Sequence, residues 1–333
     1  MNIKYIALAI VIIVVVLMAV YLVLASTGSP SGSSSTVSVA SNDIWVANEA
    51  NNTVTELSTS GATLGTYAVG SHPDAIAIDH NGNVWVANMG SDTVTKLSDT
   101  GSVIGTYGVG SKPDGIAIGS NGNVWVANSG SGTVTELSGD GGAVGTYALG
   151  KGAFPLGIAV DLNGNVWVTD GDNAVTELSS SGTVILKYID ESGGTYSIAV
   201  DGSGNLWIVA ELANAGTVTE ISDSGTTLGT YDDGGLYPQG IAIDHNGNVW
   251  VANANSNNVT EFSSSGQVLG SYAAGQVPYS IAVDSNGNIW VTDLGYPYST
   301  SDTVTELSST GTLLGTYTVG GRPEGIAAGY VHT

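Results

Sequence analysis

The sequence contains no cysteine and few residues that carry a positive charge. Without cysteine the chain forms no disulfide and supports no thiolate chemistry, so an exported fold must be stabilised by packing and hydrogen bonds alone. Lysine and arginine number only 6 against 29 acidic residues, which gives a net charge of -23. Because such a chain repels phosphate groups, we expect it to bind neither nucleic acid nor an anionic membrane surface.

Histidine is also scarce, and no histidine lies in a catalytic motif. The chain has only four: His72, His80, His245 and His332. None can be assigned to a Ser-His-Asp triad, and the phosphate-binding pattern GxxxxGK[ST] does not occur. In acid, when the carboxylates are neutral, the 6 lysines and arginines and the 4 histidines leave only 10 side-chain cations. Charge repulsion is then weak, so we expect the exported domain to tolerate low pH.

One long apolar run stands at the N-terminus. Residues 5–25 form 21 consecutive apolar or small positions, and a helix needs roughly 20 to cross a membrane. Lys4 is the only basic residue nearby, which places the N-terminus in the cytoplasm and the rest outside. We therefore predict a signal-anchor transmembrane helix over 1–25 and a Ser/Gly-rich linker over 26–41. Cleavage after Ala25 is the alternative and would give a secreted protein, although signal peptides usually have an apolar core of about 7–15 residues.

A repeat begins after the linker and is marked by tryptophan. The tryptophans follow one another at spacings of 40, 40, 42, 40, 43 and 40 residues. They are Trp45, Trp85, Trp125, Trp167, Trp207, Trp250 and Trp290. A period near 40 residues, with turn signals inside each unit, is typical of a propeller or a solenoid.

Each repeat contains four short strand patterns. In one unit these are residues 74–79, 83–88, 93–98 and 103–107, which are rich in Val, Ile, Thr, Tyr and Trp. They are too short for helices and are separated by Gly- and Asn-containing turns. Four antiparallel strands in about 40 residues are the blade of a β-propeller.

The order of the strand patterns predicts how the ring closes. The second, third and fourth patterns first occur at residues 43, 53 and 63, whereas the first pattern starts at Asp74 and occurs last at Glu324. The N-terminus therefore supplies three strands of one blade and the C-terminal GIAAGYV supplies its innermost strand. We predict an all-β fold over 42–333, a seven-bladed propeller of four-stranded blades closed by pairing the N-terminal strands with the C-terminal strand.

The repeat unit resembles that of a known group of propellers. Residues 113–128, PDGIAIGSNGNVWVAN, show the pattern best. It is similar to the repeat of the NHL and streptogramin-lyase group, and the likeness covers residues 42–331. The family includes a lyase that opens a cyclic peptide antibiotic. The resemblance implies for that lyase a His between the Pro and Gly of the repeat, a Glu at the end of W-F-T-E, and a nearby magnesium ion.

Neither of these two catalytic positions is filled as in the lyase. The first slot, between Pro and Gly, holds Asp74, Asp114, Leu156, Tyr196, Gln239, Tyr279 and Glu324. The second slot, at the end of the tryptophan strand, holds Asn48, Asn88, Asn128, Asp170, Ala210, Asn253 and Asp293. The resemblance therefore implies the scaffold, and the residues favour a binding module over an enzyme.

A candidate site follows from the positions that differ between blades. Positions common to all blades build the fold, and the variable ones gather on the face where the first strands begin. There we predict a charged sector of His72, Asp74, Lys112, Asp114, Arg322 and Glu324, and across the channel an aromatic sector of Tyr196, Tyr237 and Tyr279. A carbohydrate or peptide would suit this arrangement. The alternative is solvated turn residues with tyrosines that cover the pore mouth.

Three functions fit these observations. The first is a membrane-anchored binding or scaffolding module outside the cytoplasm, with a glycan, peptide or protein ligand. The second is a lyase or lactonase that uses Mg²⁺ or Ca²⁺ held by Asp170, Asp293 and Glu324, since hard cations prefer oxygen ligands. The third is a self-associating subunit of the cell surface.

Overall fold

The computed structural model describes residues 42–329 except 172, 190–192, 213–214 and 296–301. The predicted membrane helix and the Ser/Gly-rich linker lie outside these residues. No helix in the described part of the chain is long and apolar enough to span a membrane.

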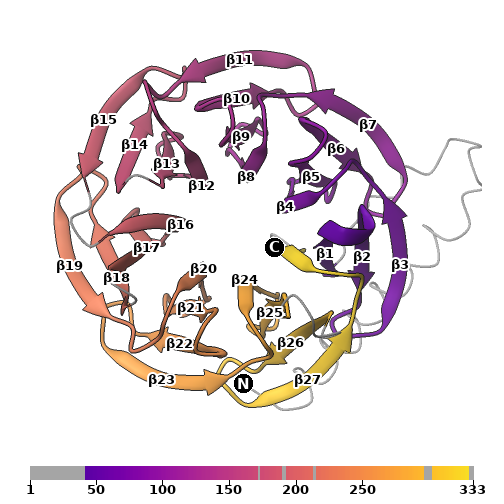
Figure 1. Ribbon diagram of the computed structural model, residues 1–333, viewed down its shortest axis with the longest axis vertical. Coiled ribbons are helices and arrows are strands. Elements are labelled where there is room, and N and C mark those ends of the chain that lie inside the picture. The colour runs from indigo at the N-terminus through magenta and orange to yellow at the C-terminus, as the bar shows by residue number, and fades with distance from the viewer. Residues whose placement is uncertain (1–41, 172, 190–192, 213–214, 296–301, 330–333) are drawn as a thin grey trace, which may run out of the picture. The chain divides into compact units, whose positions relative to one another are not determined.

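Seven four-stranded antiparallel sheets surround a central channel, which confirms the predicted propeller (Figure 1). The innermost strands are β4 (Pro73–Ile78), β8 (Pro113–Ile118), β12 (Pro155–Val160), β16 (Gly194–Val200), β20 (Pro238–Ile243), β24 (Pro278–Val283) and β28 (Pro323–Ala328). The tryptophan strands are β1 (Ile44–Asn48), β5 (Val84–Asn88), β9 (Val124–Asn128), β13 (Val166–Asp170), β17 (Leu206–Leu212), β21 (Val249–Asn253) and β25 (Ile289–Asp293).

The two outer layers complete each blade. The third strands are β2 (Thr53–Leu57), β6 (Thr93–Leu97), β10 (Thr133–Leu137), β14 (Ala174–Leu178), β18 (Ala215–Ile221), β22 (Asn258–Phe262) and β26 (Thr303–Leu307). The outermost strands are β3 (Thr63–Ala68), β7 (Val103–Gly108), β11 (Ala143–Ala148), β15 (Val184–Ile189), β19 (Thr227–Asp232), β23 (Val268–Ala273) and β27 (Leu313–Thr318). One 3-10 helix, η1 (Glu49–Asn51), lies between β1 and β2.

The ring closes through a blade shared by both ends of the described chain. Strand β28 pairs with β1 in the sheet order β28-β1-β2-β3. The pairing is antiparallel, with Val46 opposite Ile326 and Ile44 opposite Ala328. The predicted closure is therefore confirmed.

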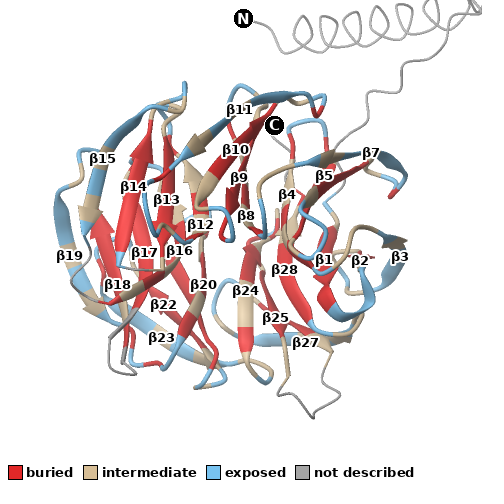
Figure 2. Cartoon of the chain, turned by 45° about the horizontal axis from the view of Figure 1, so that its top comes forward, coloured by how far each residue is buried: buried red, intermediate tan, exposed pale blue. Residues whose placement is uncertain are grey.

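The core lies between blades rather than within one. The seven tryptophans are at most 1% exposed, and Trp85, for example, packs in one cluster with Ile116 and Val124 of the next blade. Both faces of a blade are covered by its neighbours, so residues that point to opposite sides of a strand can both be apolar. Figure 2 shows the result: the second and third strands of the blades are buried, and the outermost strands are largely exposed.

Buried carboxyl groups fix each blade internally. The turn residue Asp161 accepts hydrogen bonds from the Asn163 and Asn165 amides at 2.8 Å and from Trp167 Nε1 at 3.0 Å. On the third strand, Glu136 accepts a bond from Asn123 Nδ2 at 2.7 Å and from the Tyr147 hydroxyl at 2.8 Å. These carboxyl groups recur from blade to blade and serve the scaffold.

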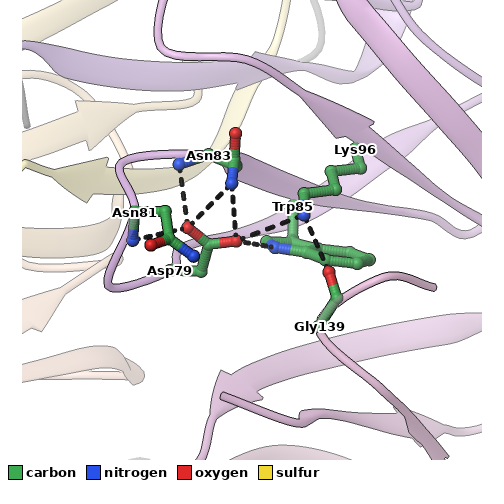
Figure 3. A network of polar contacts seen from close by, with 6 residues as sticks. All are labelled: Asp79, Asn81, Asn83, Trp85, Lys96 and Gly139. Carbon is green, nitrogen blue, oxygen red and sulfur yellow. Dashed lines mark hydrogen bonds and ion pairs between the residues drawn. The ribbon is translucent and has the colours of Figure 1, made fainter. Parts of the chain in front are cut away.

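One blade carries Lys96 in place of the recurring third-strand Glu (Figure 3). The Lys96 ammonium lies 3.5 Å from Asp79 Oδ2, donates a hydrogen bond to the Gly139 carbonyl at 2.7 Å, and stands 4.7 Å from the centre of the Trp85 ring. Asn83 Nδ2 turns to the Asp79 oxygens, at 3.1 and 3.0 Å. Lys96 therefore links two blades through the Gly139 carbonyl.

We expect Lys96→Met to lower the free energy of unfolding by about 1–3 kcal/mol, because it removes one partner of a buried ion pair while Asp79 keeps its amide donors. Urea unfolding followed by tryptophan fluorescence measures the change. Lys112→Met, at an exposed position, is the control and should stay within about 0.5 kcal/mol. Equal losses in both variants would contradict a role for the network.

Candidate functional site

The first-slot side chains surround the mouth of the central channel. A cavity of about 470 Å³ opens there, and six of the seven slot residues line it: Asp74, Asp114, Leu156, Tyr196, Gln239 and Tyr279. The register of the innermost strand shifts at the slot, for example between Pro73 and Ala75 and between Pro113 and Gly115. A bulge of this kind redirects a side chain out of the ladder, which explains why the slot faces the channel.

Glycine after the slot allows the innermost strands to approach one another. A Cβ on Gly325 would collide with the Asp74 carbonyl oxygen, and one on Gly115 would collide with that of Leu156. Only glycine removes this clash, because it has no side chain. The close approach of β28 to β4 brings the Glu324 and Asp74 side chains together.

Three carboxyl groups from adjacent strands form the acidic wall of the mouth, defined as Asp74, Asp114 and Glu324. Asp74 is 9% exposed and Glu324 is 5% exposed. Burial raises the pKa of Asp74 well above its ordinary value, and a hydrogen bond with Glu324 and the charge of Asp114 add to this. Burial and the charge of Glu324 raise the pKa of Asp114 to about 7, although a hydrogen bond from Ser129 acts in the opposite direction and lowers this pKa. Near neutral pH the wall therefore retains protons, and a cation could replace them.

Arg322 and Glu49 extend the acidic wall to the rim. Arg322 Nη1 lies 3.1 Å from Glu49 Oε2, and its Nε lies 3.2 Å from Glu324 Oε1. His72 Nε2 lies 3.9 Å from Glu49 Oε1. Sequence reasoning missed Glu49, which lies in η1, although the repeat held a signal: the equivalent positions in the next two blades are Met89 and Ser129. Of the predicted charged sector, Lys112 remains an exposed rim residue.

The other side of the mouth is apolar and aromatic. The rings of Tyr196 and Tyr237 lie 5.9 Å apart, and Phe154 and Leu156 line the same cavity. We refer to Phe154, Leu156, Tyr196 and Tyr237 as the aromatic wall. Aromatic rings with one wet edge favour contacts with apolar and planar ligand groups.

Tyr279 does not belong to this wall, and its predicted position across the channel from the charges is wrong. Its strand, β24, is the neighbour of β28 in the ring. Burial, followed by the charges of Asp74, Glu324 and Asp114, raises the pKa of Tyr279 well above its ordinary value. Tyr279 therefore stands beside the acidic wall. Counting blades from both sides of the closure would have placed it there.

Gln239 contributes a free donor between the two walls. Its strand, β20, lies between β16 and β24, and its side chain lines the cavity. The Nε2 atom is buried and has no hydrogen-bond partner among the residues that the structure describes. Because an unsatisfied buried donor costs free energy, a ligand acceptor such as a carbonyl oxygen would be favoured here.

The predicted metal ligands do not come together. Asp170 accepts a hydrogen bond from the Phe154 amide at 2.8 Å, and Asp293 accepts bonds from Gly275, Thr303 and Thr305 at 3.0, 3.1 and 2.7 Å. Neither lines the cavity. Within the described ranges no group of three His, Asp or Glu side chains could hold a metal ion. The second-slot carboxylates bond backbone amides of the loops that precede the innermost strands. The set Asp170, Asp293 and Glu324 therefore does not fit the magnesium that the resemblance implies.

Several solved structures share this architecture. A streptogramin B lyase matches with 21% identity and a TM-score of 0.70, over 87% of this chain and 93% of that one. Virginiamycin B lyase from Staphylococcus aureus matches with 19% identity and a TM-score of 0.65, over 74% and 84%. A protein of unknown function from Desulfotomaculum acetoxidans matches with 16% identity and a TM-score of 0.73, over 86% and 99%. At these identities the likeness shows the fold alone.

Sequence comparison places the chain more specifically. No curated protein matches it significantly. The sequence profile of the virginiamycin B lyase family, however, matches residues 24–296. That range covers most of the 333 residues and includes all seven tryptophan strands. The chain belongs to the virginiamycin B lyase family.

Proposed function

We propose that this chain is a ligand-binding propeller, displayed outside the cytoplasm on its N-terminal membrane anchor. The channel mouth takes a peptide that carries a positively charged group next to an aromatic or aliphatic one. The observation that carries this proposal is the placement of Asp74 and Asp114 of the acidic wall, and of Phe154, Leu156 and Tyr196 of the aromatic wall, around one cavity of about 470 Å³. The anchor rests on the apolar run at residues 5–25.

A cationic group explains the acidic wall best. Burial and the neighbouring Glu324 carboxyl group raise the pKa of Asp74 well above its ordinary value, so Asp74 is favoured in its protonated form. An ammonium or guanidinium group would replace that proton and neutralise the carboxylates. The aromatic wall would hold the adjoining side chain, and Gln239 Nε2 would donate to a peptide carbonyl. With neither the His nor the Glu of the lyase present in the two slots, binding without turnover is the expected activity.

We expect the affinity for a peptide with adjacent lysine and tyrosine residues to rise between pH 6 and pH 8. Asp114, with a pKa of about 7, must ionise to pair with the ammonium group, so binding releases protons. Calorimetry of the full-length protein in buffers of different ionisation enthalpy measures this release. Asp114→Asn should weaken binding about tenfold, which corresponds to about 1.4 kcal/mol.

Asp140→Asn, in an exposed turn, is the matched control and should leave the affinity unchanged. A neutral oligosaccharide that binds equally well at both pH values, and equally well to Asp114→Asn, would contradict the peptide proposal. It would favour a glycan ligand held by the aromatic wall.

Family membership favours a second candidate, an enzyme of the lyase or lactonase kind. A carboxyl group with a pKa near the working pH is suited to general acid–base catalysis, and Asp114 lines the cavity with such a pKa. The test is turnover of a cyclic depsipeptide or a lactone by the full-length protein. Turnover that Asp114→Asn abolishes would establish the enzyme, and binding without turnover would establish the module.

A further inference from the structure

The cavity at the channel mouth ends on an apolar floor. In every blade, the residue two positions after the first slot is isoleucine. Six of these isoleucines line the cavity, and each is 6–9% exposed: Ile76, Ile116, Ile158, Ile198, Ile241 and Ile326. Among the described residues, none farther along the innermost strands lines it. We refer to these six side chains as the isoleucine floor.

Carboxyl groups and apolar side chains lie at two depths on the same strands. Asp74 and Ile76 belong to β4, Asp114 and Ile116 belong to β8, and all four line the cavity. Two residues of a strand span at most about 7 Å. A ligand that places an apolar group on the floor and a cation beside the carboxyl groups must therefore carry these two groups close together.

The size and charge of the cavity decide which part of a peptide enters. Its volume of about 470 Å³ lies in the lower half of the range of roughly 300–1,000 Å³ found for small-molecule sites. An internal residue would bring two segments of peptide chain through the mouth, whereas a terminal residue brings only one. An ammonium group neutralises the Asp74 and Asp114 carboxylates, whereas a further carboxylate adds to their repulsion. The amino terminus is therefore the end that fits.

We propose that the cavity recognises the free amino terminus of a peptide whose first residue is aromatic or aliphatic, an inference that rests on the peptide binding proposed above. The α-ammonium group pairs with Asp74 and Asp114, and the first side chain lies between the isoleucine floor and the aromatic wall. Gln239 Nε2, which has no partner among the described residues, donates to the first peptide carbonyl. The α-ammonium group and the first side chain share one carbon atom, so they meet the short spacing, whereas a lysine carries its charge on a flexible stem.

Four peptides test the inference by calorimetry on the full-length protein in mild detergent. The reference peptide begins with phenylalanine and has a free amino terminus and an amidated carboxyl terminus. Its des-amino analogue, in which hydrogen replaces the ammonium group, should bind about tenfold more weakly or worse, because the charged partner of the carboxylates is lost without any added bulk. A peptide that begins with serine keeps the ammonium group but loses the apolar side chain, and should also bind about tenfold more weakly.

The fourth peptide separates this inference from the proposed function. It is acetylated at its amino terminus and carries adjacent internal lysine and tyrosine residues. If it binds as tightly as the reference peptide, or if the reference peptide and its des-amino analogue bind equally, recognition of the amino terminus is overturned while peptide binding stands. Equal binding of the phenylalanine and serine peptides would overturn the role of the isoleucine floor. Failure of all four peptides to bind would overturn both proposals.

A pair of variants tests whether the carboxyl groups recognise the ammonium group. In Asp114→Asn the ratio of the affinities for the reference peptide and its des-amino analogue should fall by about tenfold. Asp140→Asn, in an exposed turn, should leave this ratio unchanged. Because the ratio compares two ligands on the same protein, a partial loss of folded protein does not alter it. An unchanged ratio in Asp114→Asn would overturn the pairing of the α-ammonium group with this carboxylate.

Discussion

Removal of residues 323–333, which include β28, is expected to leave the chain unfolded at 25 °C, so that heating produces no cooperative unfolding transition. Strand β28 pairs with β1 and contacts the innermost strands on both sides, β24 and β4. Its Ile326 is buried in a cluster with Trp290 and Val46. Without it the ring is open, the edge of β1 is unpaired, and two inter-blade cores are exposed to water.

The measurement is a thermal scan of the full-length and truncated chains by near-ultraviolet circular dichroism. A point variant separates lost packing from lost length. Ile326→Asp, at a residue 6% exposed, should cost about 4–5 kcal/mol because it buries an unpaired charge. Leu314→Asp, at a residue 50% exposed, should cost less than about 1 kcal/mol. A truncated chain that melts at the temperature of the full chain would contradict closure through β28.

The propeller is expected to unfold at a higher temperature at pH 5 than at pH 8. Burial raises the pKa of Asp233 and of Asp293 to about 6, and burial and the charge of Glu324 raise that of Asp114 to about 7. A carboxyl group with a raised pKa in the folded state takes up a proton on folding. Its contribution to stability is complete below the unfolded pKa and is lost as the pH rises through the folded pKa.

The window of this effect lies between about pH 4 and pH 7. Between pH 5 and pH 8 the three groups together supply roughly 3–6 kcal/mol. For a domain of this size we expect a rise in melting temperature on the order of 10 °C. Asp79 acts in the opposite direction, because its bonds to Trp85 and Asn83 outweigh its burial and lower its pKa. Its contribution is lost only at lower pH.

Differential scanning calorimetry at pH 5, 6, 7 and 8 checks this expectation. Asp114→Asn should flatten the dependence between pH 6 and pH 8, whereas Asp140→Asn, in an exposed turn, should not change it. A melting temperature that falls steadily from pH 8 to pH 5 would show that ionised carboxylates stabilise the fold. It would also contradict the acid tolerance expected from the scarcity of cations.

The blades could be predicted because every repeat contains the same four strand patterns and the same buried tryptophan. The tryptophan period sets the blade, and the offset between Asp74 and Glu324 sets the closure. The acidic wall was predictable too, since a residue in one slot of the repeat occupies one place around the channel. The sequence did not reveal in which direction a side chain at the end of a strand points, into the channel or toward a neighbouring loop.

Asp170 and Asp293 were wrongly predicted as metal ligands for this reason. They share a slot with asparagine in four blades, and the asparagine amides bond the neighbouring strand, as Asn48 Nδ2 does with Thr55 at 2.9 Å. An aspartate that replaces such an asparagine also anchors neighbouring backbone, in spite of its charge. Glu49 shows the reverse case, because its role depends on Arg322, a residue 273 positions away in the sequence.

The acidic wall spans the seam of the ring, which is the place where the last strand, β28, meets the first blades. Asp74 and Asp114 belong to the first blades to be synthesised, whereas Glu324 arrives with the final strand. A nascent chain therefore lacks the complete wall until the ribosome has released β28, and the mouth becomes competent only when the ring has closed. A ligand seated there would touch both sides of the seam at once. A bound ligand would therefore slow the detachment of the last strand and lengthen the lifetime of the folded ring.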